Sequence, residues 1–280
     1  MHSLWVTLVV PSVLAGVVAV LVTLAIERFG GVIGGFLGTL PSTLVPASLG
    51  MYAGMETAGL REALCTVPPG MLLNAGFLWV WRALPPRLPA WGLPARLGVM
   101  IVASLSAWSV GAVALVQVTR GLSDRGMRAE WLGATGFVAL VGTGVWACWD
   151  GVPAPRGRNR VGPVALFARG ALAAAAIGTA LVIAKVGSPL LAGVASVFPA
   201  IFVTTMVSLW WSQGDAVSGG AVGPMMLGSA SVAAYALLAA LLMPLAGPVV
   251  GGSVAWLGAA LGVTLPATVW LRRRMGRMPS

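Results

Sequence analysis

Long apolar stretches recur along the whole chain, and short clusters of charged residues, prolines and glycines separate them. A helix that spans a bilayer needs about 20 mostly apolar residues, and cutting the chain at these clusters leaves stretches of that length. The predicted spans are residues 5–26, 31–54, 63–81, 97–118, 131–149, 163–184, 189–211, 222–243 and 249–271. The pattern therefore predicts an all-α, polytopic integral membrane protein with about nine transmembrane helices.

The composition excludes several other classes of protein. Of 280 residues, 58% are hydrophobic and only 9% are charged. A chain with so few charged residues cannot cover the core of a soluble protein with polar surface. The two cysteines exclude a disulfide scaffold. Cys65 opens the third span and Cys148 ends the fifth, on opposite faces of the membrane, so we predict that they do not pair.

The net charge of +10 is better explained by loops that set the orientation in the membrane than by a nucleic-acid-binding surface. The basic residues lie in loops and form no stripe with interleaved aromatic residues. We therefore expect contact with the lipid bilayer and no nucleic-acid partner. With nine spans, one side collects Arg28, Arg82, Arg87, Arg96, Arg156, Arg158, Arg160, Arg169, Arg272, Arg273, Arg274 and Arg277, and the other has Arg61, Arg120, Arg125, Arg128 and Lys185. This excess places the N-terminus outside and the C-terminus in the cytoplasm, and we expect a bacterial plasma membrane.

A pattern of small residues and a proline occurs twice. Residues 30–43 align with residues 188–201, pairing Gly35 with Gly193 and Pro41 with Pro199, and Asn74 then aligns with Ser229. An odd connecting span would invert the second copy. We thus predict a first repeat in residues 1–118 (spans one to four), a linker with span five in 119–162, and a second repeat in 163–280 (spans six to nine and a basic tail). Chance similarity between helices rich in Gly and Ala is the alternative.

The second span is an unusual way to cross a bilayer, since glycines and two prolines interrupt it. Broken helices expose polar backbone, which membranes tolerate where protein or a water-filled cavity satisfies it. We predict a midplane substrate site between the inverted repeats, lined by Gly34, Gly35, Gly38, Thr39, Pro41, Ser42, Thr43, Asn74, Ser196, Pro199 and Thr205. The alternative is that Gly34 and Gly38 only allow close helix packing.

Acidic residues lie at span ends or in loops, which disfavours an Asp/Glu proton relay through the membrane. Glu27 and Lys185 occupy matching positions of the two repeats on opposite faces. We predict them as candidate gates, with simple anchoring at the interface as the alternative.

Enzyme chemistry has little support in the sequence. His2 is the single histidine, and no catalytic triad, metal motif or nucleotide-binding loop occurs. We expect no enzyme, cofactor or metal, although a membrane-embedded lipid-modifying enzyme stays open. The sequence favours a transporter, facilitator or channel for a small ion or polar solute. The alternative is a non-transporting scaffold or an assembly or permease subunit, and a homo-oligomer or a separate partner subunit is compatible with either function.

Overall fold

The computed structural model describes residues 5–29, 40–149 and 162–275, and these ranges contain helices and no strand. The elements are η1 (Trp5–Val9), α2 (Val10–Phe29), α4 (Leu44–Gly54), α5 (Thr57–Ala83), η2 (Pro85–Arg87), α6 (Leu93–Ser123), α7 (Ala129–Ala147), α8 (Pro163–Lys185), α9 (Pro189–Ser196), α10 (Ala200–Gln213), α11 (Asp215–Ala259), η3 (Ala260–Thr264) and α12 (Leu265–Met275). The all-α class predicted from the sequence is confirmed.

Five helical segments of the described chain are long and apolar enough to cross a membrane. They are Thr57–Ala83, Leu93–Ser123, Pro163–Lys185, Pro189–Trp211 and Asp215–Arg274. Prolines occupy the first turns of α6, α8 and α9, where a missing N–H costs no helical hydrogen bond. These segments are compatible with a membrane location.

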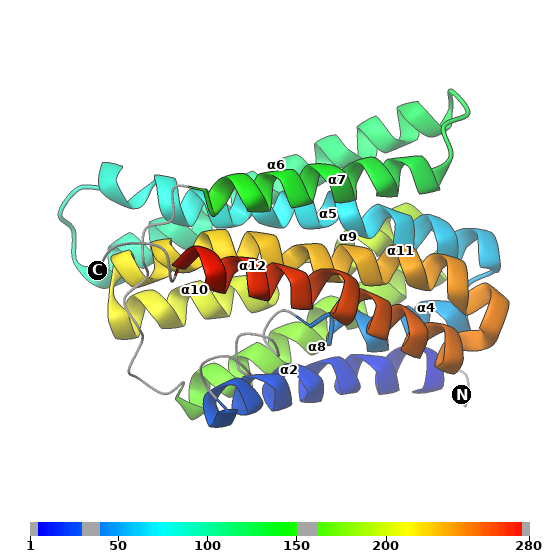
Figure 1. Cartoon of the computed structure of the whole chain (residues 1–280), viewed down its shortest axis with the longest axis horizontal. Coiled ribbons are helices and arrows are strands. Elements are labelled where there is room, and N and C mark those ends of the chain that lie inside the picture. Colours follow the sequence, from blue (N-terminus) through cyan, green and yellow to red (C-terminus); the bar gives the residue numbers. More distant parts are fainter. Residues whose placement is uncertain (1–4, 30–39, 150–161, 276–280) are drawn as a thin grey trace.

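The last of these segments folds into two antiparallel arms. Gly247, at φ 79° and ψ 167°, interrupts α11 in a conformation that favours glycine. Gly251 then lies directly against the carbonyl group of Leu242, an approach that leaves no room for a side chain. Figure 1 shows α11 running to one end of the bundle and the chain returning through α12. The sequence predicted this reversal as a break between residues 243 and 249.

The core lies where α5, α7 and α11 meet, and each of these helices contacts the other two. Glycines of α7 permit the contact. A Cβ atom at Gly136 would lie 2.7 Å from the backbone nitrogen of Pro69 in α5, and one at Gly144 would lie 2.7 Å from the Cα atom of Leu227 in α11. Helix α7 is therefore held between α5 and α11 at backbone distance.

Helices α2 and α8 form a second close pair. A Cβ atom at Gly16 would lie 2.7 Å from the carbonyl oxygen of Gly170, and one at Gly170 would lie 3.2 Å from the carbonyl oxygen of Gly16. The approach is thus reciprocal. Each helix places its glycine against the backbone of the other.

The outward faces of the helices are strongly apolar. Large exposed side chains include Val110, Val138, Phe167, Leu245 and Val249, each of which exposes more than two thirds of its surface. Extensive exposed apolar surface marks a face that contacts protein or membrane. The surface is therefore suited to lipid.

Polar contacts join several helix ends and loops to one another. Arg96 forms an ion pair with Asp215 at 3.4 Å, Arg82 donates to the carbonyl oxygen of Ala147 at 2.7 Å, and Arg274 donates to that of Trp149. In Figure 1 the first described helix begins at the right end and α12 ends at the left end. The first described helix therefore begins on one side of the bundle, and α12 ends on the other.

Both cysteines are buried and free, so the prediction that they do not pair is confirmed. The described residues contain no cluster of three or more His, Cys, Asp or Glu side chains that would hold a metal ion.

Candidate functional site at an interrupted helix

An interruption divides the predicted seventh span. Helix α9 ends at Ser196 and α10 begins at Ala200, while Val197 (φ −105°, ψ 17°) and Pro199 (φ −76°, ψ 35°) lie outside regular helix. Pro199 has no N–H to donate to the preceding turn, which removes one helical hydrogen bond at the break. The sequence signal was the proline, and the structure places a break at the same position.

Asn74, in the middle of α5, meets this interruption. Its side chain is only 2% exposed, and its Nδ2 atom donates to the carbonyl oxygen of Val197 at 2.9 Å and to the sulfur of Met71 at 3.4 Å. An amide on one helix therefore satisfies a carbonyl group freed by the break in another. The Oδ1 atom of Asn74 is buried without a hydrogen-bond partner among the described residues.

The surroundings of the interruption are closely packed. A Cβ atom at Gly70 would lie 2.6 Å from the side chain of Val197, and the Trp108 ring of α6 packs edge-on against Phe198 with 5.3 Å between ring centroids. Trp108 is 8% exposed, and its Nε1–H finds no acceptor in the described part of the chain. An unpaired acceptor on Asn74 and an unpaired donor on Trp108 thus border the same three-residue break.

The hydroxyls predicted in the second repeat have different environments. Ser196 Oγ donates to the carbonyl oxygen of Gly193 at 2.7 Å, which is a bond within its own helix. Thr205 Oγ1 donates to Ile201 at 2.7 Å and also accepts from Arg169. Ser196 and Pro199 therefore lie at the interruption beside Asn74, while Thr205 lies about 9 Å further along α10 and faces α8.

The corresponding region of the predicted first repeat is described only in part. Gly34, Gly35, Gly38 and Thr39 lie outside the described residues. Leu40–Thr43 forms a turn, in which the N–H of Ser42 donates to Leu40 at 2.8 Å, and α4 begins only at Leu44. Pro41 is buried there, and the side chains of Ser42 and Thr43 are half-buried. Non-helical backbone thus accompanies Pro41 as it accompanies Pro199.

A buried hydrogen bond that the sequence did not reveal connects α4 to α11. The hydroxyls of Ser48 and Tyr235 lie 2.6 Å apart, and neither side chain has measurable exposure. Ser229, which aligns with Asn74, instead donates to Met225 of its own helix at 2.9 Å. The predicted second repeat therefore has no copy of the Asn74 contact at the aligned position.

Arg169 is a residue that sequence reasoning misplaced. We counted it with the loop arginines that set orientation, yet it lies in α8 and is 8% exposed. Its Nε atom donates to Thr204 Oγ1 at 3.4 Å, and its Nη2 atom donates to Thr205. Its position seven residues into an apolar span was the signal that could have identified it, because buried arginines in spans face polar partners.

The structure describes the side chain of only one of the two candidate gates. Lys185 is the last residue of α8 and is exposed. Glu27 belongs to α2, and its side chain lies outside the described residues. The gating role of both stays a prediction.

Comparison of the chain with protein-family models, curated proteins and solved structures gives no match.

Proposed function

We propose that the chain is an integral membrane protein of nine spans, arranged as two inverted four-helix repeats joined by a central helix. The packing supports this arrangement. Spans three and eight (α5 and the first arm of α11) both pack on α7, which is the proposed central span, and spans one and six (α2 and α8) pack on each other. The reciprocal approach of Gly16 and Gly170 is what two helices related by a twofold axis would make.

The interrupted spans support the same symmetry. Span seven is hydrogen-bonded to span three by Asn74 and Val197, and span two is hydrogen-bonded to span eight by Ser48 and Tyr235. Each interrupted span is thus tied to the third helix of the opposite repeat. Inverted repeats with discontinuous helices are common in transporters, because one scaffold can then adopt outward-open and inward-open packings.

We propose, on this basis, that the protein is a transporter, facilitator or channel for a small ion or polar solute. The observation that carries the proposal is the break at residues 197–199, whose freed carbonyl group meets a buried amide with one unpaired oxygen. Irregular backbone inside a membrane is tolerated only where it is buried in protein or lines a water-filled cavity, and the unpaired oxygen of Asn74 favours the second case. We place the solute beside Asn74, with the N-terminus outside and the C-terminus in the cytoplasm of a bacterial cell.

A non-transporting scaffold is the second candidate, and the glycine contacts favour it. Gly136 and Gly144 bring α7 to backbone distance from both neighbours, as a rigid assembly subunit would need. The hydroxyl of Ser196 is also occupied by its own helix rather than directed at a solute.

Flux through reconstituted vesicles tests the proposal. The purified full-length protein in liposomes should accelerate entry of at least one of Na⁺, K⁺, Cl⁻, urea and glycerol above the rate of empty liposomes. Replacing Asn74 by Leu should abolish that flux, whereas Ser229→Ala, which removes only a bond within one helix, should preserve it. If the protein accelerates none of these probes, the scaffold becomes the better account.

A further inference from the structure

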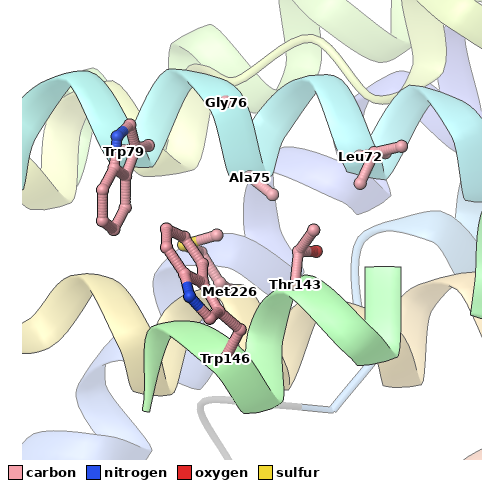
Figure 2. Close-up of a pocket in the computed structure, with 7 residues that line it drawn as sticks. All are labelled: Leu72, Ala75, Gly76, Trp79, Thr143, Trp146 and Met226. Atoms are coloured by element: carbon pink, nitrogen blue, oxygen red, sulfur yellow. The ribbon is translucent and has the colours of Figure 1, made fainter. Parts of the chain in front are cut away.

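An apolar groove lies between α5, α7 and α11, away from the interruption. It has a volume of about 260 Å³ and is lined by Leu72, Gly76 and Trp79 of α5, Thr143 and Trp146 of α7, and Met226 of α11, among others. Figure 2 shows the indoles of Trp79 and Trp146 reaching toward each other at one end, with Leu72 and Thr143 toward the other. The ring centroids of Trp79 and Trp146 are 4.7 Å apart.

The groove opens on the outer surface of the bundle. Trp146 is 57% exposed, Gly76 is also exposed, and no atom lies within 4 Å of the position that a Cβ atom would take at Gly76. In a membrane this opening faces the lipid. The volume is slightly below the roughly 300–1,000 Å³ of ordinary small-molecule sites, which suits a slender chain.

The lining selects an apolar occupant. Thr143 carries its one side-chain hydroxyl, and that hydroxyl already donates to the carbonyl oxygen of Leu140 at 2.9 Å. The other groups are aliphatic, aromatic or a thioether. Apart from Thr143, the polar side-chain atoms of the lining are the indole nitrogens of Trp79 and Trp146. A polar solute would therefore lose its hydration in the groove for few hydrogen bonds, while a hydrocarbon chain has no such bonds to lose.

Positive charge collects just beyond the two indoles. Arg82 follows Trp79 by one turn, its guanidinium lies 5.6 Å from the Trp79 ring centroid, and it donates to Ala147 at 2.7 Å. Arg274 stacks 4.4 Å from the Trp149 ring centroid and donates to the carbonyl oxygen of Trp149. Two guanidinium groups therefore meet at the C-terminal end of α7.

These arginines have donors to spare. A guanidinium has five N–H donors, and each of these bonds to α7 occupies only one of its nitrogens. The Nε–H of Arg274 is buried without a partner in the described chain. Arginine pairs well with phosphate, and amphipathic indoles prefer the level between hydrocarbon and headgroups.

We propose that this groove is a binding site for an anionic phospholipid, with one acyl chain between α5 and α7 and the phosphate at Arg82 and Arg274. The order along the groove carries the proposal, since an apolar slot, a pair of indoles and two guanidinium groups match the order of groups in a phospholipid. The site rests on the proposed membrane location and does not depend on transport, because a scaffold would bind the same lipid.

Native mass spectrometry of the full-length protein tests the site with two probes of identical acyl chains, phosphatidylglycerol and phosphatidylcholine. We expect preferential retention of phosphatidylglycerol. Gly76→Leu fills the open part of the groove and should weaken binding of both lipids. Gly142→Leu is the matched control, because a Cβ atom at exposed Gly142 also meets nothing within 4 Å and Gly142 is not a groove residue.

Charge is tested separately. Arg82→Gln should weaken phosphatidylglycerol binding by about tenfold, the loss of one charge-assisted contact, and weaken phosphatidylcholine binding less, because the choline cation already offsets the charge of its phosphate. Arg273→Gln removes an exposed charge beside Arg274 and should change neither. The proposal is overturned if phosphatidylglycerol binding survives both Gly76→Leu and Arg82→Gln in protein of normal thermal stability. It is equally overturned if Gly76→Leu changes the oligomeric mass and not the lipid, because the groove would then be an interface between copies.

Discussion

Asn74 shows how a single buried amide can hold an irregular backbone in place. Its Nδ2 atom satisfies the carbonyl group of Val197 across 123 positions of sequence. In a bundle where most hydroxyls bond the preceding turn of their own helix, this bond reaches between helices. Its Oδ1 atom has no hydrogen-bond partner among the described residues, and an unsatisfied buried acceptor is costly. A bound solute with a hydrogen-bond donor would remove that cost.

Replacing Asn74 by Leu should therefore lower stability as well as flux. The substitution keeps the number and branching of the side-chain heavy atoms but leaves the Val197 carbonyl group unsatisfied, at a cost of about 1–3 kcal/mol. Thermal unfolding in detergent measures the change, with Ser229→Ala as the control. Equal melting temperatures for wild type and Asn74→Leu would show that the bond is not formed.

The Ser48–Tyr235 bond makes a second prediction at this scale. Tyr235→Phe removes one hydroxyl from a buried pair and should cost about 0.5–1.5 kcal/mol. Ser48→Ala should cost a similar amount, and the double variant should cost less than the two losses together, since the bond can be lost only once. Strict additivity in a double-mutant cycle of unfolding free energies would count against this contact.

Sequence reasoning identified Asn74 but not its partner, and the reason is physical. A polar amide inside an apolar span is visible in the chain, whereas the carbonyl group it satisfies depends on how helices 123 positions apart pack. Tyr235 was missed because a tyrosine is compatible with an interface as well as a core. Arg169 was misplaced because basic residues were assigned to loops by type, before their depth in the span was weighed.

At the scale of elements, α7 contains glycines of two kinds, one at a close helix contact and one in open space. A Cβ atom at Gly136 would meet the backbone of Pro69 at 2.7 Å, whereas one at Gly142, on the same helix, would meet nothing within 4 Å. Backbone cannot yield as a flexible side chain can. The two glycines therefore form a matched pair.

Gly136→Ala should destabilise the protein by about 1–3 kcal/mol, because α7 must move away from α5 to admit the methyl group. Gly142→Ala should be neutral or stabilise by up to about 1 kcal/mol, since alanine favours helix. Melting temperatures of the two variants in the same detergent make the comparison. A tolerated Gly136→Ala would mean that α5 and α7 are further apart than the structure has them.

The extent of the helices could be predicted from apolar run length, as in α6 and α8, where charges and prolines mark the ends. The break at Pro199 could also be anticipated, because proline removes a backbone donor. The reversal at Gly247 could be predicted in place, between the spans that end at residue 243 and begin at residue 249, but its backbone conformation (φ 79°, ψ 167°) could not.

At the scale of the molecule, the proposed topology predicts a fixed orientation. A fluorescent protein that matures only in the cytoplasm should be bright when fused after Ser280, and alkaline phosphatase should be active when inserted at Asp124, on the opposite side. The two reporters exchanged between these positions are the controls. Bright fluorescence at Asp124 would reverse the orientation, and brightness at both positions would contradict nine spans.

The central claim is that an aqueous pathway reaches the interruption beside Asn74, and access of water to single cysteines tests it most directly. In a background with Cys65 and Cys148 replaced, cysteines at Ser42, Ser196 and Thr205 would be exposed to a membrane-impermeant thiol reagent from each side. Asp124 and Arg273, exposed at the proposed outer and inner faces, serve as positive controls, and Ala233, fully buried in α11, serves as the negative one. The account predicts that Ser196 is labelled and that the rate differs between the two sides. Protection of all three positions, with both loop controls labelled normally, would contradict it.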